Sequence, residues 1–217
     1  SLLAVGARGD DTGGTGVLAS RGAVYLLTLD TANLDDAPTL ENKIDDNSVV
    51  GLNLANSDLF GNSVALNDSG SLLAVGARGD NTGGNDRGAV YLFSLDPANL
   101  AAAPTLDNKI AHGTSGLSLT NADSFGSSVA LNDGGSLLAV GADGDNTGGN
   151  SRGAVYLLTL DPANLAAAPT LDNKIAHGTS GLSLANFNRF GSSVALNDNG
   201  SLLAVGAFGD NTGGNNR

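Results

Sequence analysis

Apolar residues occur in short blocks separated by segments rich in Gly, Asn and Asp. In one stretch of the chain the blocks are Ser127–Leu131, Leu137–Ala142 and Ala154–Leu160. Apolar blocks of this length, bounded by turn residues, predict β-strands. The polar segment Asn132–Gly135 predicts a tight turn that joins the first two strands as a hairpin. The second and third blocks are almost continuously apolar, so both faces of these strands should be covered.

The segment after the third block predicts a turn and a weaker strand. Asp161–Leu165 has the composition of one capped helical turn with Asp161 as its N-cap, and Pro169 should end that turn. A fourth strand is then expected around Lys174–Ile175 or around Gly181–Leu184. The unit therefore contains about four short strands.

This pattern recurs along the whole chain. The string SLLAVGA begins at residues 1, 71, 136 and 201. The segments 71–135 and 136–200 differ at 9 positions, so 56 of their 65 residues are identical. These positions divide the chain into repeat 1 (1–70, without a first strand), repeat 2 (71–135), repeat 3 (136–200) and a partial repeat 4 (201–217). Repeats of this kind bury their apolar faces by stacking on one another.

Flat sheets covered on both sides and repeated every 65–70 residues predict an all-β fold. We expect β-propeller-type blades of about four antiparallel strands, each packed between its neighbours. Gly141 and Ala142 would let backbones approach closely, and Phe125, Phe190 and Tyr156 would fill the space between sheets. The alternative is an open β-solenoid in which hairpin units stack along a line.

Composition and charge limit the classes of function. Asp and Glu outnumber Lys and Arg by 22 to 10, and this net charge of −12 disfavours nucleic acid and anionic membranes as partners. The chain has no Cys and no Met, which removes thiolate metal sites and Cys nucleophiles. No apolar run is long enough for a transmembrane segment. Motifs of serine hydrolases, phosphate-binding loops and zinc proteases are absent, so we expect no enzyme.

Three recurring motifs resemble those of a known family. Phe-Gly-x-Ser-Val-Ala-Leu, Leu-Ala-Val-Gly-Ala and Gly-Ala-Val-Tyr-Leu follow one another in this order. The sequence resembles the FG-GAP repeat of integrin α-subunit β-propellers and of bacterial surface proteins, including haemagglutinin-like ones. This resemblance implies a β-propeller and an extracellular or cell-surface location. The Phe-Gly and Gly-Ala elements stand at Phe60-Gly61, Phe125-Gly126, Phe190-Gly191, Gly6-Ala7, Gly76-Ala77, Gly141-Ala142 and Gly206-Ala207.

The sequence departs from this family in two ways. Arg8, Arg78, Asp143 and Phe208 replace the Pro of the GAP element. Calcium-binding members carry several carboxylates in the loop between the first two strands, but that loop holds one Asp per repeat here, as in Asn132–Gly135. Because Ca²⁺ takes 6–8 oxygen ligands, the family's calcium site does not carry over.

The loop after the second strand of each unit provides the remaining candidates for a calcium site. Acidic and amide side chains with adjacent glycines are the oxygen-rich ligands that Ca²⁺ accepts, and they are also ordinary turn residues. Both interpretations stay open from the sequence. The candidates are Asp10, Asp11, Asp80, Asn81, Asp143, Asp145, Asn146, Asp210 and Asn211.

The tripeptide Arg-Gly-Asp occurs in two copies of this loop, as Arg8-Gly9-Asp10 and as Arg78-Gly79-Asp80. Certain integrins recognise this tripeptide, so both copies are candidate binding sites. The equivalent positions in the other repeats keep Gly-Asp and vary the first residue, which favours a structural Gly-Asp turn. Lys43, Lys109 and Lys174 recur in an Asn-Lys-Ile string and are interpreted as a solvated strand edge that resists unwanted pairing.

These observations predict a non-enzymatic extracellular structural or adhesive repeat protein, a surface or filament component. Equivalent loops would present the same weak contact several times, so avidity would exceed any single affinity. The alternative is a ligand-binding propeller module, with carbohydrate as its ligand, in a larger protein. The predicted strand Leu202–Ala207 and the missing first strand before Ser1 suggest complementary edges, so head-to-tail self-association is also expected.

Overall fold

Strands and turns make up the part of the chain that the structure describes. The computed structural model describes residues 1–11 and 19–211. Its strands are β1 (Leu2–Ala7), β2 (Ala23–Thr28), β3 (Thr39–Ile44), β4 (Phe60–Leu66), β5 (Leu72–Ala77), β6 (Ala89–Ser94), β7 (Thr105–Ala111), β8 (Phe125–Leu131), β9 (Leu137–Ala142), β10 (Ala154–Thr159), β11 (Thr170–Ala176), β12 (Phe190–Leu196) and β13 (Leu203–Ala207). None of the described residues lies in an α-helix. The all-β prediction is confirmed.

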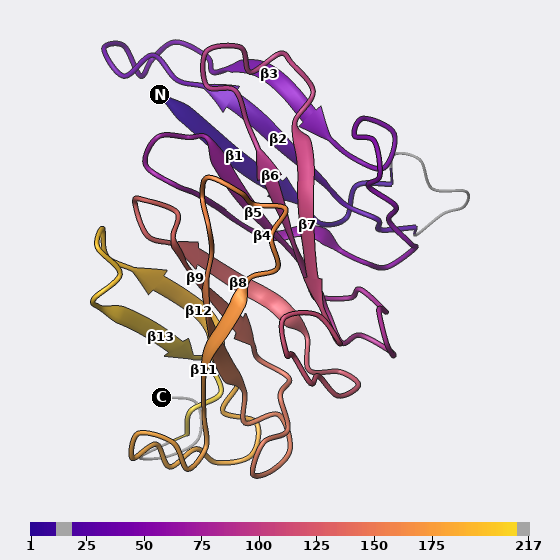
Figure 1. The fold of residues 1–217 in the computed structure, drawn as a ribbon, viewed down its shortest axis with the longest axis vertical. Helices are drawn as coiled ribbons and strands as arrows, with labels where there is room; N and C mark the ends of the chain where they lie inside the picture. Colours follow the sequence, from indigo (N-terminus) through magenta and orange to yellow (C-terminus); the bar gives the residue numbers. More distant parts are fainter. Residues whose placement is uncertain (12–18, 212–217) are drawn as a thin grey trace.

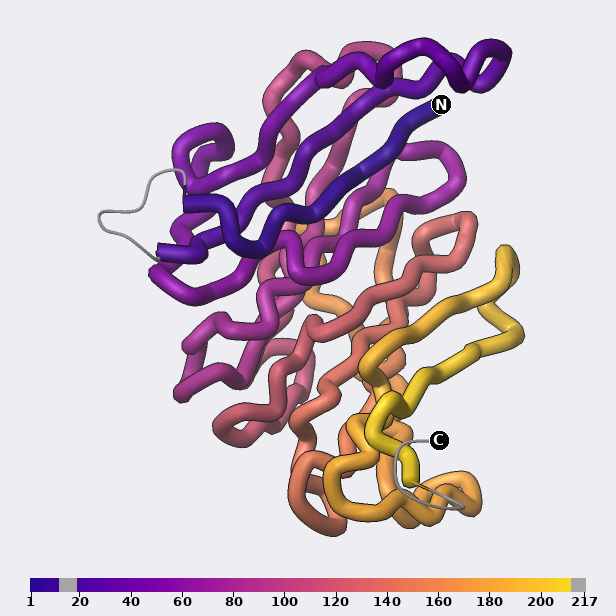
Figure 2. The backbone as a smooth tube through the Cα atoms, turned by 180° about the vertical axis from the view of Figure 1, so that it is seen from behind, coloured from indigo at the N-terminus to yellow at the C-terminus, as the bar shows by residue number. Residues whose placement is uncertain are grey.

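The strands form four antiparallel sheets that follow one another in chain order. β1–β3 form a three-stranded sheet, β4–β7 and β8–β11 form four-stranded sheets, and β12 pairs with β13. The N-terminal sheet and the C-terminal hairpin lie at opposite ends of the stack (Figures 1 and 2). This is the predicted arrangement of successive propeller blades. Each four-stranded sheet crosses a boundary between two sequence repeats, because its Phe-Gly strand precedes the SLLAVGA string.

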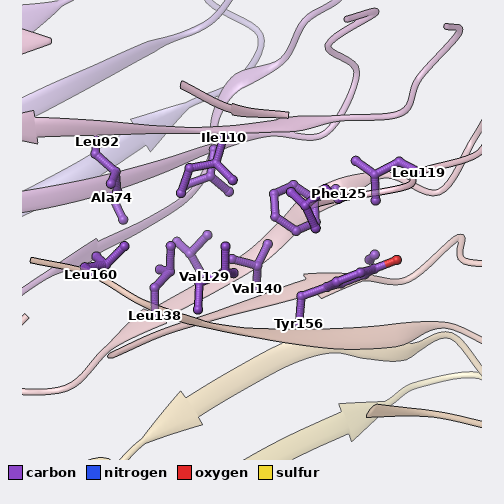
Figure 3. Packing of buried hydrophobic residues seen from close by; sticks show 14 of the residues in the cluster. Ala74, Leu92, Ile110, Leu119, Phe125, Val129, Leu138, Val140, Tyr156 and Leu160 are labelled. Atoms are coloured by element: carbon purple, nitrogen blue, oxygen red, sulfur yellow. The ribbon is translucent and has the colours of Figure 1, made fainter. Parts of the chain in front are cut away.

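The central strands are buried on both faces, as their continuous apolar sequences predict. Every residue of β5 is buried, and alternate side chains face opposite neighbours. Leu73 and Val75 pack with the sheet β1–β3, whereas Leu72 and Ala74 pack with the sheet β8–β11. Figure 3 shows the second interface, with Ala74 on one side and Val140 on the other. The core therefore consists of layers between blades.

Aromatic side chains anchor these layers. Phe125 is fully buried, and its ring meets the ring of Tyr156 edge to face at a centroid distance of 5.4 Å. Phe60 and Tyr91 repeat this geometry one blade earlier at 5.5 Å. Such pairs contribute about 1 kcal/mol beyond the burial of their surface. The predicted role of the aromatic residues between sheets is thus seen in the structure.

The Phe-Gly and Gly-Ala elements fit together between blades. A Cβ atom on Gly76 would lie 2.1 Å from the carbonyl oxygen of Gly126 in the next blade. Gly126 has a φ of 86°, and the register of β8 against β9 shifts between Phe125 and Ser128, which marks a β-bulge at this glycine. The same close approach joins Gly141 to Gly191. Glycine at both positions lets the two backbones touch.

Several local predictions need correction. The segment Asp161–Leu165 forms turns and no helical turn, although Asp161 accepts a hydrogen bond from the N–H of Ala163 at 3.0 Å. Of the two ranges considered for the fourth strand, Lys174–Ile175 lies in β11, whereas Gly181–Leu184 contains no strand. The strand β13 pairs with β12, and no other strand of the described residues pairs with it. Head-to-tail pairing through β1 and β13 stays a prediction, which scattering at increasing concentration would test.

Candidate functional site

Two sets of loops meet at one end of each blade. The loops after the second and fourth strands lie at the same end, because successive strands are antiparallel. In the sheet β4–β7 these loops are residues 78–88 and 112–124, and in the sheet β8–β11 they are residues 143–153 and 177–189. The Gly-Asp element begins the first loop of each pair. Most sequence-predicted candidates therefore gather at this loop end.

The Asp of the Gly-Asp element holds three groups of its own blade. Asp80 accepts hydrogen bonds from the Tyr91 hydroxyl and from the N–H of Thr82, both at 2.8 Å. The Nζ atom of Lys109 lies 2.7 Å from Asp80 Oδ2 and 5.1 Å from the centroid of the Tyr91 ring. Asp80 is only 2% exposed. The carboxylate thus joins β6 and β7 to the loop after β5.

The same network recurs in the neighbouring blades. Asp145 accepts from the Tyr156 hydroxyl at 2.9 Å and lies 2.7 Å from Lys174 Nζ. In the first sheet, Asp10 accepts from the Tyr25 hydroxyl at 2.8 Å and pairs with Lys43 at 3.1 Å. The interpretation of these lysines as a solvated strand edge is incomplete, because each one pairs with the Asp of its blade. We call this recurring set the Asp-Tyr-Lys network.

Electrostatics keep the network in one ionisation state. Burial alone would raise the pKa of Asp80, but the hydrogen bonds from Lys109 and Thr82 outweigh it, and the pKa is lowered. Asp145 shows the same balance with Lys174 and Thr147. Burial and the adjacent carboxylate raise the pKa of Tyr91 far above its usual range. At neutral pH the acid of the network is therefore a carboxylate and the tyrosine a neutral phenol.

A polar pocket opens beside this network in both four-stranded blades. The first pocket has a volume of about 260 Å³ and the second about 180 Å³. Every lining residue of the first has its counterpart 65 positions later in the second. The first is lined by Asn53, Ala55, Asp58, Asp80, Asn81, Thr82 and Lys109, and the second by Ser118, Thr120, Asp123, Asp145, Asn146, Thr147 and Lys174. We call them the Asp58 pocket and the Asp123 pocket.

A second buried acid in each pocket has different partners in the two copies. Asp58 and Asp123 are 3% and 2% exposed. Asp123 accepts from both the N–H and the hydroxyl of Thr120, each at 2.7 Å. Asp58 accepts from the N–H of Ala55 at 2.8 Å, and its Oδ1 atom is buried without a hydrogen-bond partner among the described residues. Burial raises the pKa of Asp58 to about 6, and nearby Asp80 adds to the effect.

Repeat 3 shows how an amide serves at the same position. Asn188 is the counterpart of Asp58, and its Oδ1 atom accepts from the N–H of Ala185. Its Nδ2 atom donates to the carbonyl of Gly209 at 3.2 Å. Gly79 is the counterpart of Gly209 beside Asp58. An asparagine at position 58 would therefore find a partner for each side-chain atom.

We expect Asp58→Asn to stabilise the protein at pH 7 by up to about 3 kcal/mol. An acid whose pKa is raised to about 6 in the fold loses stability as pH rises from its unfolded value through 6. The amide does not titrate, so the variant should lack this decrease. Urea unfolding between pH 4 and 8 measures the difference. Asp123→Asn serves as the control with a smaller gain, because Thr120 already satisfies Asp123; equal gains in both variants would contradict the explanation.

The structure places the remaining metal candidates in several local environments. Asn81 and Asn146 accept backbone hydrogen bonds within their loops, from Asp86 and Ser151. Asp143 pairs with Arg189 at 3.3 Å, and Asp11 accepts from the N–H of Ser20. Asp210 and Asn211 also have partners. Within residues 1–11 and 19–211, no three acidic or histidine side chains are grouped as a metal site would require.

In the Arg-Gly-Asp tripeptide at 78–80, the side chains of the Arg and the Asp lie in different surroundings. Asp80 is buried in the Asp-Tyr-Lys network, whereas Arg78 lines a separate cavity of about 400 Å³ that also includes Arg189. In the other copy, Asp10 pairs with Lys43 and Arg8 donates to Asn62 at 3.3 Å. An inward carboxylate favours the structural Gly-Asp turn over recognition by an integrin.

Sequence reasoning did not identify the tyrosines or the second acids as members of one site. Asp80, Tyr91 and Lys109 come from three different elements, and only the register of the sheet brings them together. The available signal was their joint recurrence at 65-residue spacing. Asp58 was less visible, because its loop varies most between repeats: positions 120 and 122–124 all differ from their counterparts 65 residues later.

Part of the chain matches a known repeat family. The sequence model of the FG-GAP repeat matches residues 48–93 and 120–158, which confirms the resemblance found in the motifs. These two segments include strands β4, β5, β8 and β9, most of β6 and β10, and the loops that carry Asp80 and Asp145. No curated protein sequence matches this chain.

Solved structures resemble the fold at low sequence identity. One is the periplasmic gluconolactonase PpgL of Pseudomonas aeruginosa, with a TM-score of 0.53 and 14% identity over 97% of this chain and 48% of that one. Another is Sqt1 from Chaetomium thermophilum, with a TM-score of 0.48 and 18% identity over 94% of this chain and 38% of that one. The chain thus spans about half the length of the gluconolactonase and a smaller share of Sqt1. The likeness to PpgL concerns the fold. None of the described residues forms a helix with the length and apolarity to cross a membrane.

Proposed function

We propose that this chain is a non-enzymatic, extracellular or cell-surface repeat module that is structural or adhesive and binds through several equivalent weak contacts. The observation that carries this proposal is the recurrence of the loop-end pocket with the same set of positions in two successive blades. A repeated pocket offers the same contact twice in a fixed spacing. FG-GAP repeats, typical of surface proteins, support the location.

The chemistry of the pockets supports binding over catalysis. The carboxylate, ammonium and phenol of each Asp-Tyr-Lys network are paired with one another. The lowered pKa of Asp80 and the raised pKa of Tyr91 hold these two groups in fixed ionisation states. A general acid or base needs a pKa near the working pH and access to its substrate. Asp80 and Tyr91 lack such a pKa, and Asp58, whose pKa is raised to about 6, is only 3% exposed. The rim residues Asn53, Ser118 and Asn81 are exposed and polar. This surface suits the alternative ligand class, carbohydrate, whose hydroxyl groups need many hydrogen-bonding partners.

Binding to a glycan array printed at low and high density tests this proposal. We expect saturable binding whose apparent affinity rises with glycan density, because two pockets then act together. Asn53→Trp and Ser118→Trp each place a large side chain at an exposed rim position and block one pocket. Each single variant should lose the density dependence and keep weak binding. A purely structural element would give no saturable signal at either density, and that result would contradict the adhesive part of the proposal.

A further inference from the structure

The Asp58 and Asp123 pockets differ at one position that controls a buried oxygen atom. In the Asp123 pocket, the hydroxyl of Thr120 donates to Asp123 Oδ1 at 2.7 Å. In the Asp58 pocket, Ala55 replaces this threonine, and Asp58 Oδ1 has no hydrogen-bond partner among the described residues. Both acids place their other oxygen on the N–H of the same position, at 2.8 and 2.7 Å. The two carboxylates therefore have the same orientation, and the Asp58 carboxylate lacks the hydroxyl donor that Asp123 has.

The volumes of the two pockets differ in the same sense. The Asp58 pocket measures about 260 Å³ against about 180 Å³ for the Asp123 pocket. Removing the Cγ and hydroxyl groups of a threonine enlarges a pocket and leaves its acceptor unsatisfied. A buried acceptor without a partner destabilises the protein. An external hydroxyl group that occupies this position would recover that free energy.

We propose that the Asp58 pocket binds a hydroxyl group of a small polyhydroxy ligand, a saccharide, which donates to Asp58 Oδ1 where the Thr120 hydroxyl does so in the next blade. Asn53, Asn81 and Thr82 lie around the same pocket and offer further polar groups to the remaining hydroxyls. The Asp123 pocket is filled at this point by its own threonine and is the weaker site. This inference rests on the proposed function and assigns its stronger contact to one blade.

Exchanging Ala55 and Thr120 between the pockets tests the inference, with each pocket measured alone. Ser118→Trp blocks the Asp123 pocket, so saccharide binding in that background reports the Asp58 pocket. Adding Ala55→Thr should weaken binding about tenfold or more, because the new hydroxyl satisfies Asp58 from within. In the Asn53→Trp background, adding Thr120→Ala should strengthen binding by a similar factor. The probes are free glucose, galactose, mannose and N-acetylglucosamine, followed by titration calorimetry and by ligand-detected NMR.

Thermal unfolding without saccharide gives an independent readout. Ala55→Thr should raise the melting temperature and Thr120→Ala should lower it, which also shows that both variants fold. If the melting temperatures shift in this way but no saccharide binds to either pocket, water satisfies Asp58 and the inference is overturned. If saccharide binds equally before and after both exchanges, the proposed function stands and the assignment to Asp58 fails.

Discussion

Gly76→Ala is expected to destabilise the protein by about 3 kcal/mol or more. The added Cβ would lie 2.1 Å from the carbonyl oxygen of Gly126 and 2.2 Å from the Ser63 hydroxyl. The oxygen of Gly126 belongs to the backbone of the next blade, so the clash cannot be relieved by rotating a side chain. The backbones of the two sheets would have to move apart at this contact. Urea unfolding followed by circular dichroism measures the loss.

The matched control is Gly134→Ala in the turn between β8 and β9. A Cβ atom on Gly134 meets no heavy atom within 4 Å, and the equivalent positions hold Ser69 and Asn199. This substitution should change stability by less than about 0.5 kcal/mol. Neither Gly76 nor Gly134 has a positive φ, so the comparison isolates the contact between blades. A loss below about 1 kcal/mol for Gly76→Ala would contradict the close packing of the Phe-Gly and Gly-Ala elements.

The order of the strands could be predicted from the sequence because the buried strands are continuous apolar blocks. β9, which the structure places at Leu137–Ala142, has the predicted bounds, and β10 differs by one residue at its end. Continuous apolar strands need cover on both faces, so the stacking of sheets follows from the same pattern. The first strand begins at Phe125 and was expected at Ser127, because the bulge at Gly126 continues the pairing past a residue that usually breaks it.

The candidate site was only partly predictable. The position of Asp80 in a loop was visible, but a Gly-Asp turn looks the same whether its carboxylate faces solvent or the protein. Its partner Tyr91 lies opposite Val75 in the sheet, and Lys109 lies opposite Tyr91. That register depends on the pairing of three strands and on the bulge between Leu92 and Phe93. Sequence spacing alone does not determine it.

The difference between Asp58 and its counterparts shows the same limit at a single atom. The exchange of Thr120 for Ala55 is visible in the sequence, but its effect depends on which oxygen of the acid the hydroxyl reaches. Asn188 reaches a third solution with an amide and a backbone carbonyl. At this position, nearly identical repeats therefore differ in whether one hydrogen bond is made, lost or replaced.

Asp145→Ala is expected to destabilise the protein by about 3 kcal/mol at pH 7. The Tyr156 hydroxyl is buried and would lose its acceptor, and Lys174 would lose the carboxylate 2.7 Å away. The ammonium group is partly exposed and can turn to solvent, which limits the loss. Tyr156→Phe removes one hydrogen bond of the same network and should cost about 1 kcal/mol.

The loss in Asp145→Ala should also depend on pH. The lowered pKa of Asp145 means that its contribution is present above its unfolded value of about 3.9 and is lost as pH falls through the folded pKa. The stability gap between the wild type and the variant should therefore narrow below pH 4. Comparing the two proteins cancels the opposite effect of Asp58. Asp35→Ala, at an exposed turn, is the control and should show no gap. A gap at Asp145 that stays constant from pH 7 to pH 3 would show that packing, and no ionised carboxylate, holds this loop to the blade.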